Sequence, residues 1–280
     1  MDLNSTGNRL CAAWNIIHQC NYRCPYCFFF GRWAEENCHY LSVPAEEWIG
    51  CWDRVYDNYG STHIHISGGE PFIYPGFIKI ISEISKKHTL NIVTNLSCDL
   101  KTFIHEISPQ RVTITPSFHP SFTQANSFIE KLKFLRENGF GGSASLVGYP
   151  PVLSQVLNIK KEFEKEGFAF AVLPFSGSYN GISYPQGYTA EEKKVVGLLA
   201  VNNPLNKEYQ LERTSPKGKL CCAGQAYVRI HPDGTVLRCA HSGSIGNILK
   251  EGLRLLAAPL PCESDYCDCS NELIYIVENN

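Results

Sequence analysis

Short runs of apolar and β-branched residues alternate with amphipathic stretches from residue 11 to about residue 200. The runs that predict strands are 12–18, 63–67, 90–94, 111–117, 143–148 and 168–174. In segments 77–87, 128–138 and 153–166, apolar side chains recur at helical spacing, and Gly139 and Gly167 follow the last two as C-cap signals. Strands that alternate with helices predict an α/β fold whose parallel sheet is wrapped by right-handed crossovers into an open or closed barrel.

The most unusual residues directly follow predicted strands. Cysteines 20, 24 and 27 follow the first strand, Gly68-Gly69-Glu70-Pro71 the second, Asn95 the third and His119 the fourth. Because chemistry in parallel α/β folds gathers at the carboxyl ends of the strands, we expect these residues to share one site.

The pattern changes after residues 189–201. Segments 202–204 and 215–218 have the composition of loops, and the runs 226–231 and 235–239 flank Pro232-Asp233-Gly234, which predicts a β-hairpin. We therefore expect a core of residues 1–204 and a small, cysteine-rich module of residues 205–280.

Composition narrows the class of protein. A chain of 280 residues with 44% hydrophobic residues can bury a large core. The net charge is −2 and the basic residues are scattered, which argues against a nucleic-acid partner. The chain has no signal-peptide pattern and no apolar run of the roughly 20 residues that cross a bilayer, so we expect a soluble, cytoplasmic protein without a membrane partner.

Thirteen cysteines in such a protein indicate metal binding or redox chemistry rather than disulfides. Cys20, Cys24 and Cys27 form a C-x3-C-x2-C loop, and soft thiolates favour zinc, copper(I) or an iron–sulfur cluster. Three ligands leave one coordination position open for a reacting molecule; the alternative is a structural zinc loop completed by His18 or His39. For the isolated cysteines we expect buried hydrophobic positions: Cys11, Cys38, Cys51 and Cys98.

The cysteine loop, with Tyr26 before its last cysteine, resembles the C-x3-C-x-aromatic-C signature of the radical S-adenosylmethionine (SAM) superfamily. Ser67 to Pro71 resembles that family's GGEP element, which grips the amino group of SAM. The resemblance implies a partial (β/α)6 TIM-like barrel, a [4Fe–4S] cluster on Cys20, Cys24 and Cys27, and SAM chelating the fourth iron. Further cofactor contacts are implied by position after the strands: Phe28, Thr94, Asn95, Ser117, Ser145, Val147, Leu173 and Phe175.

The C-terminal module resembles the SPASM and twitch extensions of radical SAM enzymes. Cys221, Gly234 and Cys239 match the opening C-x(9–15)-G-x4-C, and the tail adds Cys262, Cys267 and Cys269. So few tail cysteines favour the twitch type, with one auxiliary [4Fe–4S] cluster; zinc and two clusters are the alternatives. Cys221 fits the spacing better than Cys222.

A radical-generating cluster beside an auxiliary cluster suggests a net oxidation of a small polar metabolite, of sugar or cyclitol type, with electrons from flavodoxin or ferredoxin. Candidate catalytic residues are His119, Tyr149 and Tyr179, with Arg229 as a further possible base. Two other interpretations remain open: maturation of a ribosomally made peptide, by thioether formation or epimerisation, and a non-catalytic zinc scaffold. Molybdopterin-type cyclisation is disfavoured, because that family ends in Gly-Gly and this chain ends in Asn279-Asn280.

Overall fold

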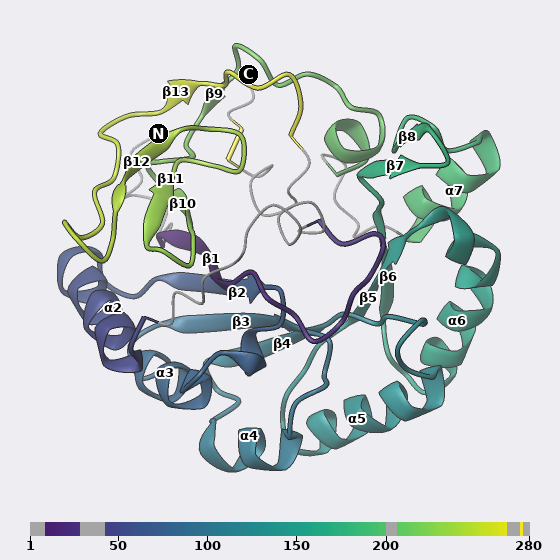
Figure 1. Cartoon of the computed structure of the whole chain (residues 1–280), viewed down its shortest axis with the longest axis horizontal. Coiled ribbons are helices and arrows are strands. Elements are labelled where there is room, and N and C mark those ends of the chain that lie inside the picture. The colour runs from purple at the N-terminus through teal and green to yellow at the C-terminus, as the bar shows by residue number, and fades with distance from the viewer. Residues whose placement is uncertain (1–8, 29–42, 200–205, 268–274, 277–280) are drawn as a thin grey trace.

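The protein has an α/β architecture in which an arc of helices surrounds a curved parallel sheet (Figure 1). The structure is a computed structural model, and it describes residues 9–28, 43–199, 206–267 and 275–276. Cys38, His39 and Cys269, which the sequence singled out, lie outside the described residues. No helix in the described ranges is long and apolar enough to span a membrane.

The six strands expected from the sequence are confirmed. β1 (Cys11–Ile17), β2 (His63–Gly68), β3 (Thr89–Thr94) and β4 (Val112–Pro116) pair in parallel in that order. β5 (Ala144–Gly148) and β6 (Phe170–Pro174) form a second parallel pair, and a bridge between Ser117 and Ser145 joins it to the end of β4. The sheet as described is therefore a partial barrel that does not close.

The crossover helices lie on the outside of the sheet (Figure 1). α3 (Phe77–Ile84), α5 (Ala125–Glu137) and α6 (Leu153–Lys165) occupy the three segments with helical spacing, and α7 (Ala190–Leu199) follows β6. The sequence analysis did not assign α2 (Ala45–Tyr59) or α4 (Leu100–Glu106). The buried face of α2 is built from aromatic and small residues, Trp48, Cys51, Trp52 and Val55, rather than from a run of aliphatic side chains.

Successive side chains along each strand point to opposite faces of the sheet, so the strands have an apolar outer face and a polar inner face. Trp14 on β1 is fully buried, and its ring lies 4.7 Å from that of Trp48 and 5.4 Å from that of Trp52 on α2. Burying one such large side chain contributes roughly 1.5–3 kcal/mol, so this outer face holds the helices in place. The alternate residues, among them Asn15 and Ser67, point to the inner face, where the hydroxyl of Ser67 donates to Asn15 Oδ1 at 2.9 Å.

The C-terminal hairpin extends the same sheet. β10 (Tyr227–Ile230) pairs in parallel with β1 and antiparallel with β11 (Thr235–Leu237), which continues to β12 (Ser244–Asn247). The hairpin predicted around Gly234 is thus confirmed, and the sheet runs across the expected boundary between residues 204 and 205. Two small antiparallel pairs complete the fold: β7 (Gly177–Tyr179) with β8 (Ile182–Tyr184), and β9 (Leu220–Cys221) with β13 (Leu260–Pro261).

Candidate active site

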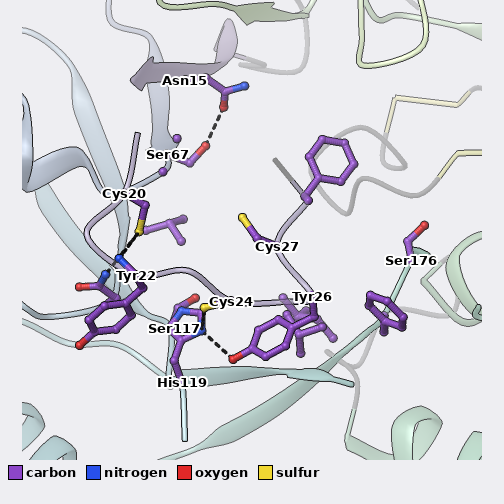
Figure 2. A pocket seen from close by; sticks show the side chains of 18 of the residues that line it. Asn15, Cys20, Tyr22, Cys24, Tyr26, Cys27, Ser67, Ser117, His119 and Ser176 are labelled. Carbon is purple, nitrogen blue, oxygen red and sulfur yellow. Dashed lines mark hydrogen bonds between the residues drawn. The ribbon is translucent and has the colours of Figure 1, made fainter. Parts of the chain in front are cut away.

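A cavity of about 420 Å³ lies at the carboxyl ends of the parallel strands, and Cys20, Cys24 and Cys27 all line it (Figure 2). The cysteines sit in the loop after β1, where the amide of Cys27 donates to the carbonyl of Cys24 at 3.1 Å. The amide of Tyr22 donates to the sulfur of Cys20 at 3.3 Å. The described residues contain no three His, Cys, Asp or Glu side chains that converge at the spacing of a single metal ion.

Electrostatics at the loop favour a cation that stabilises thiolates. Burial above all, together with the negative charges that Cys27 and Cys20 acquire as thiolates, raises the pKa of Cys24 to about 12. Burial is also the main reason why the pKa of Cys20 is raised. Because thiolates are the metal-binding form of cysteine, a bound iron–sulfur core would supply the positive charge that stabilises them.

Gly68 and Gly69 lie against the backbone that enters the cysteine loop, and this close approach requires glycine at both positions. The amide of Gly69 donates to the carbonyl of Ile17 at 2.8 Å, and the amide of Glu70 donates to that of Gln19 at 2.9 Å. A Cβ atom on Gly69 would lie 1.8 Å from the carbonyl oxygen of Gln19, and one on Gly68 would lie 2.0 Å from that of Ile17. The two glycines thus let the end of β2 seat the start of the cysteine loop.

Glu70 is buried, with 1% of its surface exposed, and it does not line the cavity. Its carboxylate accepts from the hydroxyl of Thr94 at 2.8 Å, from the amide of Asn95 at 2.8 Å and from the amide of Phe72 at 3.1 Å. Burial raises its pKa, and these three donors oppose that shift. In this arrangement Glu70 ties the ends of β2 and β3 together; its predicted contact with the amino group of SAM stays a prediction.

Asn95 and His119 connect later strands to the cysteine loop. Asn95 Nδ2 lies 3.8 Å from the sulfur of Cys20 and donates to Asn21 Oδ1 at 3.0 Å. His119 Nδ1 lies 3.4 Å from the sulfur of Cys24 and 3.0 Å from the hydroxyl of Tyr26. Burial lowers the pKa of His119 to about 4, so its imidazole is neutral at pH 7.

Most residues expected at the cofactor line the cavity. Those that do are Tyr26, Phe28, Ser67, Gly68, Gly69, Thr94, Asn95, Ser117, Val147, Leu173 and Phe175, together with His119. Five expected residues are not among the described lining residues: Glu70, Pro71, Ser145, Tyr149 and Tyr179. Tyr149 has its ring 5.1 Å from that of Tyr26 and 5.2 Å from that of Tyr179, so these tyrosines form an aromatic cluster beside the cavity.

Several lining residues were missed by the sequence analysis. Ala13 and Asn15 lie on the inner face of β1, and the period-two alternation of that strand was the signal that could have found them. Gln210 and Arg213 come from a stretch just past the expected core, where no motif marks them. Arg229, considered only as a possible base, lines the cavity from β10.

The C-terminal cysteines gather in a second place. Cys221, Cys239 and Cys267 belong to one apolar cluster that also contains Cys11 and Tyr227, and Cys262 is close enough to Cys221 that its charge would raise the pKa of Cys221. Cys11 and Cys51 are buried as expected, whereas Cys98 is only partly buried.

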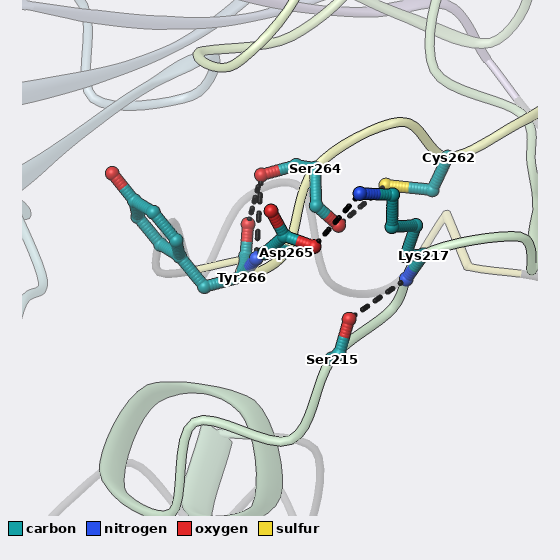
Figure 3. A network of polar contacts seen from close by, with 6 residues as sticks. All are labelled: Ser215, Lys217, Cys262, Ser264, Asp265 and Tyr266. Atoms are coloured by element: carbon teal, nitrogen blue, oxygen red, sulfur yellow. Dashed lines mark hydrogen bonds and ion pairs between the residues drawn. The ribbon is translucent and has the colours of Figure 1, made fainter.

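A polar network anchors the tail that carries Cys262 and Cys267 (Figure 3). Lys217 Nζ lies 3.0 Å from Asp265 Oδ1, and the hydroxyl of Ser264 donates to the carbonyl of Tyr266 at 2.7 Å. The first contact joins the tail to the segment that precedes β9, and the second lies within the tail.

Comparison with known proteins agrees with this geometry. The family model described as "Radical SAM superfamily" matches residues 14–152, about half of the chain. Two curated relatives are GTP 3',8-cyclases: that of Crocosphaera subtropica is 26% identical over 166 residues, and that of Photorhabdus laumondii is 32% identical over 84 residues. The matches cover 57% and 29% of this chain, but only 49% and 25% of those proteins.

Solved structures share the fold at low identity. SuiB of Streptococcus suis bound to S-adenosylmethionine has a TM-score of 0.65 at 16% identity, covering 90% of this chain and 66% of that chain. Native anSMEcpe with bound AdoMet has a TM-score of 0.66 at 16% identity, covering 95% of this chain and 83% of that chain. From the family match, together with this fold, we conclude that the chain belongs to the radical SAM superfamily, whose enzymes use a [4Fe–4S] cluster and SAM.

Proposed function

We propose that the chain binds a [4Fe–4S] cluster through Cys20, Cys24 and Cys27 and acts, with SAM, on a small polar metabolite held in the same cavity. The observation that carries this proposal is the convergence of the three cysteines, Gly68-Gly69 and Asn95 on one cavity at the strand ends. When bound and reduced, the cluster supplies the electron that cleaves SAM to methionine and a 5′-deoxyadenosyl radical, which takes a hydrogen atom from the substrate.

The chain's own residues position these cofactors. His119 and Asn95 hold the sulfurs of Cys24 and Cys20 from the ends of two different strands. Ser67 and Ser117 line the cavity and would offer hydroxyl groups to the polar parts of SAM, while Leu173 and Phe175 would offer apolar surface to its adenine. The hydroxyl of Thr94 is bound to Glu70 and is not available for this role.

An auxiliary [4Fe–4S] cluster on Cys221, Cys239 and the tail cysteines 262, 267 and 269 would complete the machinery. Ala13, Arg229 and Ala240 line the cavity on the side of the C-terminal module, and Ala240 directly follows Cys239. The cavity therefore reaches towards the second group of cysteines. This supports transfer of an electron out of the substrate and hence a net oxidation, with a flavodoxin or ferredoxin as the external donor to the first cluster.

Two other substrates have a specific observation in their favour. The curated relatives are named GTP 3',8-cyclases, which favours a nucleotide and a cyclisation. One fold neighbour, anSMEcpe, was solved with a bound peptide, at a TM-score of 0.63 and 15% identity, which favours peptide maturation. A sugar or cyclitol-like metabolite remains the first proposal, because hydroxyl and amide side chains, among them Ser176 and Gln210, line part of the cavity.

The proposal is tested by anaerobic reconstitution followed by iron and sulfide analysis, then by adding dithionite and SAM. We expect about eight iron atoms per chain for two [4Fe–4S] clusters and formation of 5′-deoxyadenosine. Cys24→Ala should abolish both the SAM-binding cluster and 5′-deoxyadenosine, whereas Cys51→Ala, a buried thiol outside the cavity, should keep them. A fully loaded wild-type protein that forms no 5′-deoxyadenosine would contradict the proposal, and a colourless zinc protein would establish the scaffold alternative.

A further inference from the structure

Two arginines line the cavity from the C-terminal half of the chain. Arg229 lies on β10, in register between Ala13 of β1 and Leu237 of β11, and Arg213 follows the short helical turn η3 (Asn206–Leu211). Among the described residues that line the cavity there is no Asp or Glu. This end of the site thus carries two permanent positive charges, because the arginine guanidinium stays protonated in proteins.

Arg213 is held in place by several contacts. Its Nη2 donates to the hydroxyl of Ser176 at 2.6 Å, and its guanidinium lies 4.7 Å from the ring centroid of Tyr266. Tyr266 belongs to the anchored tail of Figure 3, where its amide donates to the hydroxyl of Ser264 at 3.3 Å. Ser176 lies across the cavity from Cys20 (Figure 2), so Arg213 marks the wall opposite the start of the cysteine loop.

The backbone of Arg213 has φ = +57°, in the left-handed region. This conformation is uncommon for residues other than glycine, and strained residues persist where the surrounding structure holds them, which is often at functional sites. Gln210, from the same segment, is buried and also lines the cavity. The segment therefore brings an amide and a guanidinium to one wall.

We propose that Arg213 and Arg229, with Gln210, bind an anionic group of the substrate, a phosphate or a carboxylate. This rests on the function proposed above and restricts its substrate to an anionic small molecule. Guanidinium groups bind both anions through paired, charge-assisted hydrogen bonds.

A competing assignment is that Arg213 binds the carboxylate of SAM itself. The two assignments differ in what a substitution changes: loss of substrate-anion affinity on the first, and loss of SAM affinity on the second. The reconstituted holoenzyme therefore needs to be titrated with each ligand separately.

The experiment is anaerobic calorimetry on the full chain, reconstituted and saturated with SAM. Inorganic pyrophosphate serves as the phosphate probe and tricarballylate as the carboxylate probe. We expect the wild type to bind one of the two, which identifies the anion, and Arg213→Gln and Arg229→Gln to weaken that binding by about tenfold or more. The matched control is Arg254→Gln, whose exposed side chain lies outside the cavity and which should bind the probe as the wild type does.

Arg213→Lys and Arg229→Lys keep the charge and should weaken binding less than the glutamine variants, which separates anion binding from a failure to fold. The proposal is overturned when the wild type binds neither probe, when both glutamine variants bind the probe as the wild type does, or when Arg213→Gln weakens SAM binding and leaves the probe unaffected. Failure of the proposed function has a different signature: a wild-type protein that takes up no iron or fails to bind SAM.

Discussion

His119 Nδ1 lies 3.4 Å from the sulfur of Cys24, although 95 positions in the sequence separate the two residues. The same nitrogen is 3.0 Å from the hydroxyl of Tyr26, and the rings of His119 and Tyr26 are nearly parallel, at an interplanar angle of 12°. The end of β4 thereby fixes the middle of the cysteine loop. A neutral imidazole in this place can orient the side chain of Cys24, which we propose as a cluster ligand.

Replacing His119 with Phe should weaken retention of the iron–sulfur cluster. Residues that contact metal ligands typically affect metal affinity by about 10–100-fold. The measurement is iron per chain after timed exposure to a chelator, with the electron paramagnetic resonance signal of the reduced cluster as a second readout. His105→Phe is the control, because His105 is exposed and lies outside the cavity. Equal iron loss from both variants would show that His119 does not support Cys24.

Gly69→Ala should destabilise the protein even before any cofactor binds. The added Cβ would lie 1.8 Å from the carbonyl oxygen of Gln19, so the backbone at the start of the cysteine loop must move. Overpacking of this kind costs about 1–3 kcal/mol or more, and the melting temperature should fall by several degrees. Gly141→Ala is the matched control, because no atom lies within 4 Å of its added Cβ. If the two variants melt at the same temperature, the glycine is not needed for this contact.

The sequence was sufficient to predict the framework because the framework follows local patterns. Period-two alternation and helical spacing predicted β1 to β6 and three of the helices that cover them. The same patterns said little about α2, whose buried face uses Trp48 and Trp52. Parallel pairing of β10 with β1 joins residues more than two hundred positions apart, and no local pattern encodes such a pairing.

Site residues could be predicted where they belong to short sequence motifs. The prediction failed where their position depends on long-range contacts. The cysteine loop and Gly68-Gly69 were found from sequence, yet the contact of Gly69 with Gln19 depends on the register of β1 with β2. Arg213 escaped notice because its position depends on a left-handed backbone and on a tail that returns from residue 266. The positions of these residues depend on the tertiary fold, so a local sequence pattern does not reveal them.

The stability of the fold should fall as pH drops from about 6.5 towards 4, and His65 should contribute to this fall. Burial above all, together with the neighbouring His63, whose ring centroid is 4.5 Å away, lowers the pKa of His65 to about 4. An unfolded histidine has a pKa of about 6.5, so the unfolded state binds more protons in this window and is favoured there. Above about pH 6.5 both states are neutral and the contribution of His65 is fully present.

The measurement for His65 is the melting temperature of the wild type, of His65→Gln and of His105→Gln as a function of pH. We expect His65→Gln to flatten the decline between pH 6.5 and 4, while the exposed His105 changes little. An unchanged slope in His65→Gln would assign the decline to other groups, among them His63 and His88, whose pKa values burial also lowers.

The adjacent cysteines Cys221 and Cys222, at the end of β9, should differ in their importance for the proposed auxiliary cluster. Cys221 is buried in the apolar cluster that contains Cys239 and Cys267, whereas Cys222 is partly exposed and does not belong to that cluster. Cys221→Ala should therefore lower the iron content from about eight to about four atoms per chain, and Cys222→Ala should leave it unchanged. The two variants are matched in composition and differ by one position, so general damage to the module would affect both. Loss of iron in Cys222→Ala alone would exchange the roles of the two residues, and full iron in both variants would argue against an auxiliary cluster at this place.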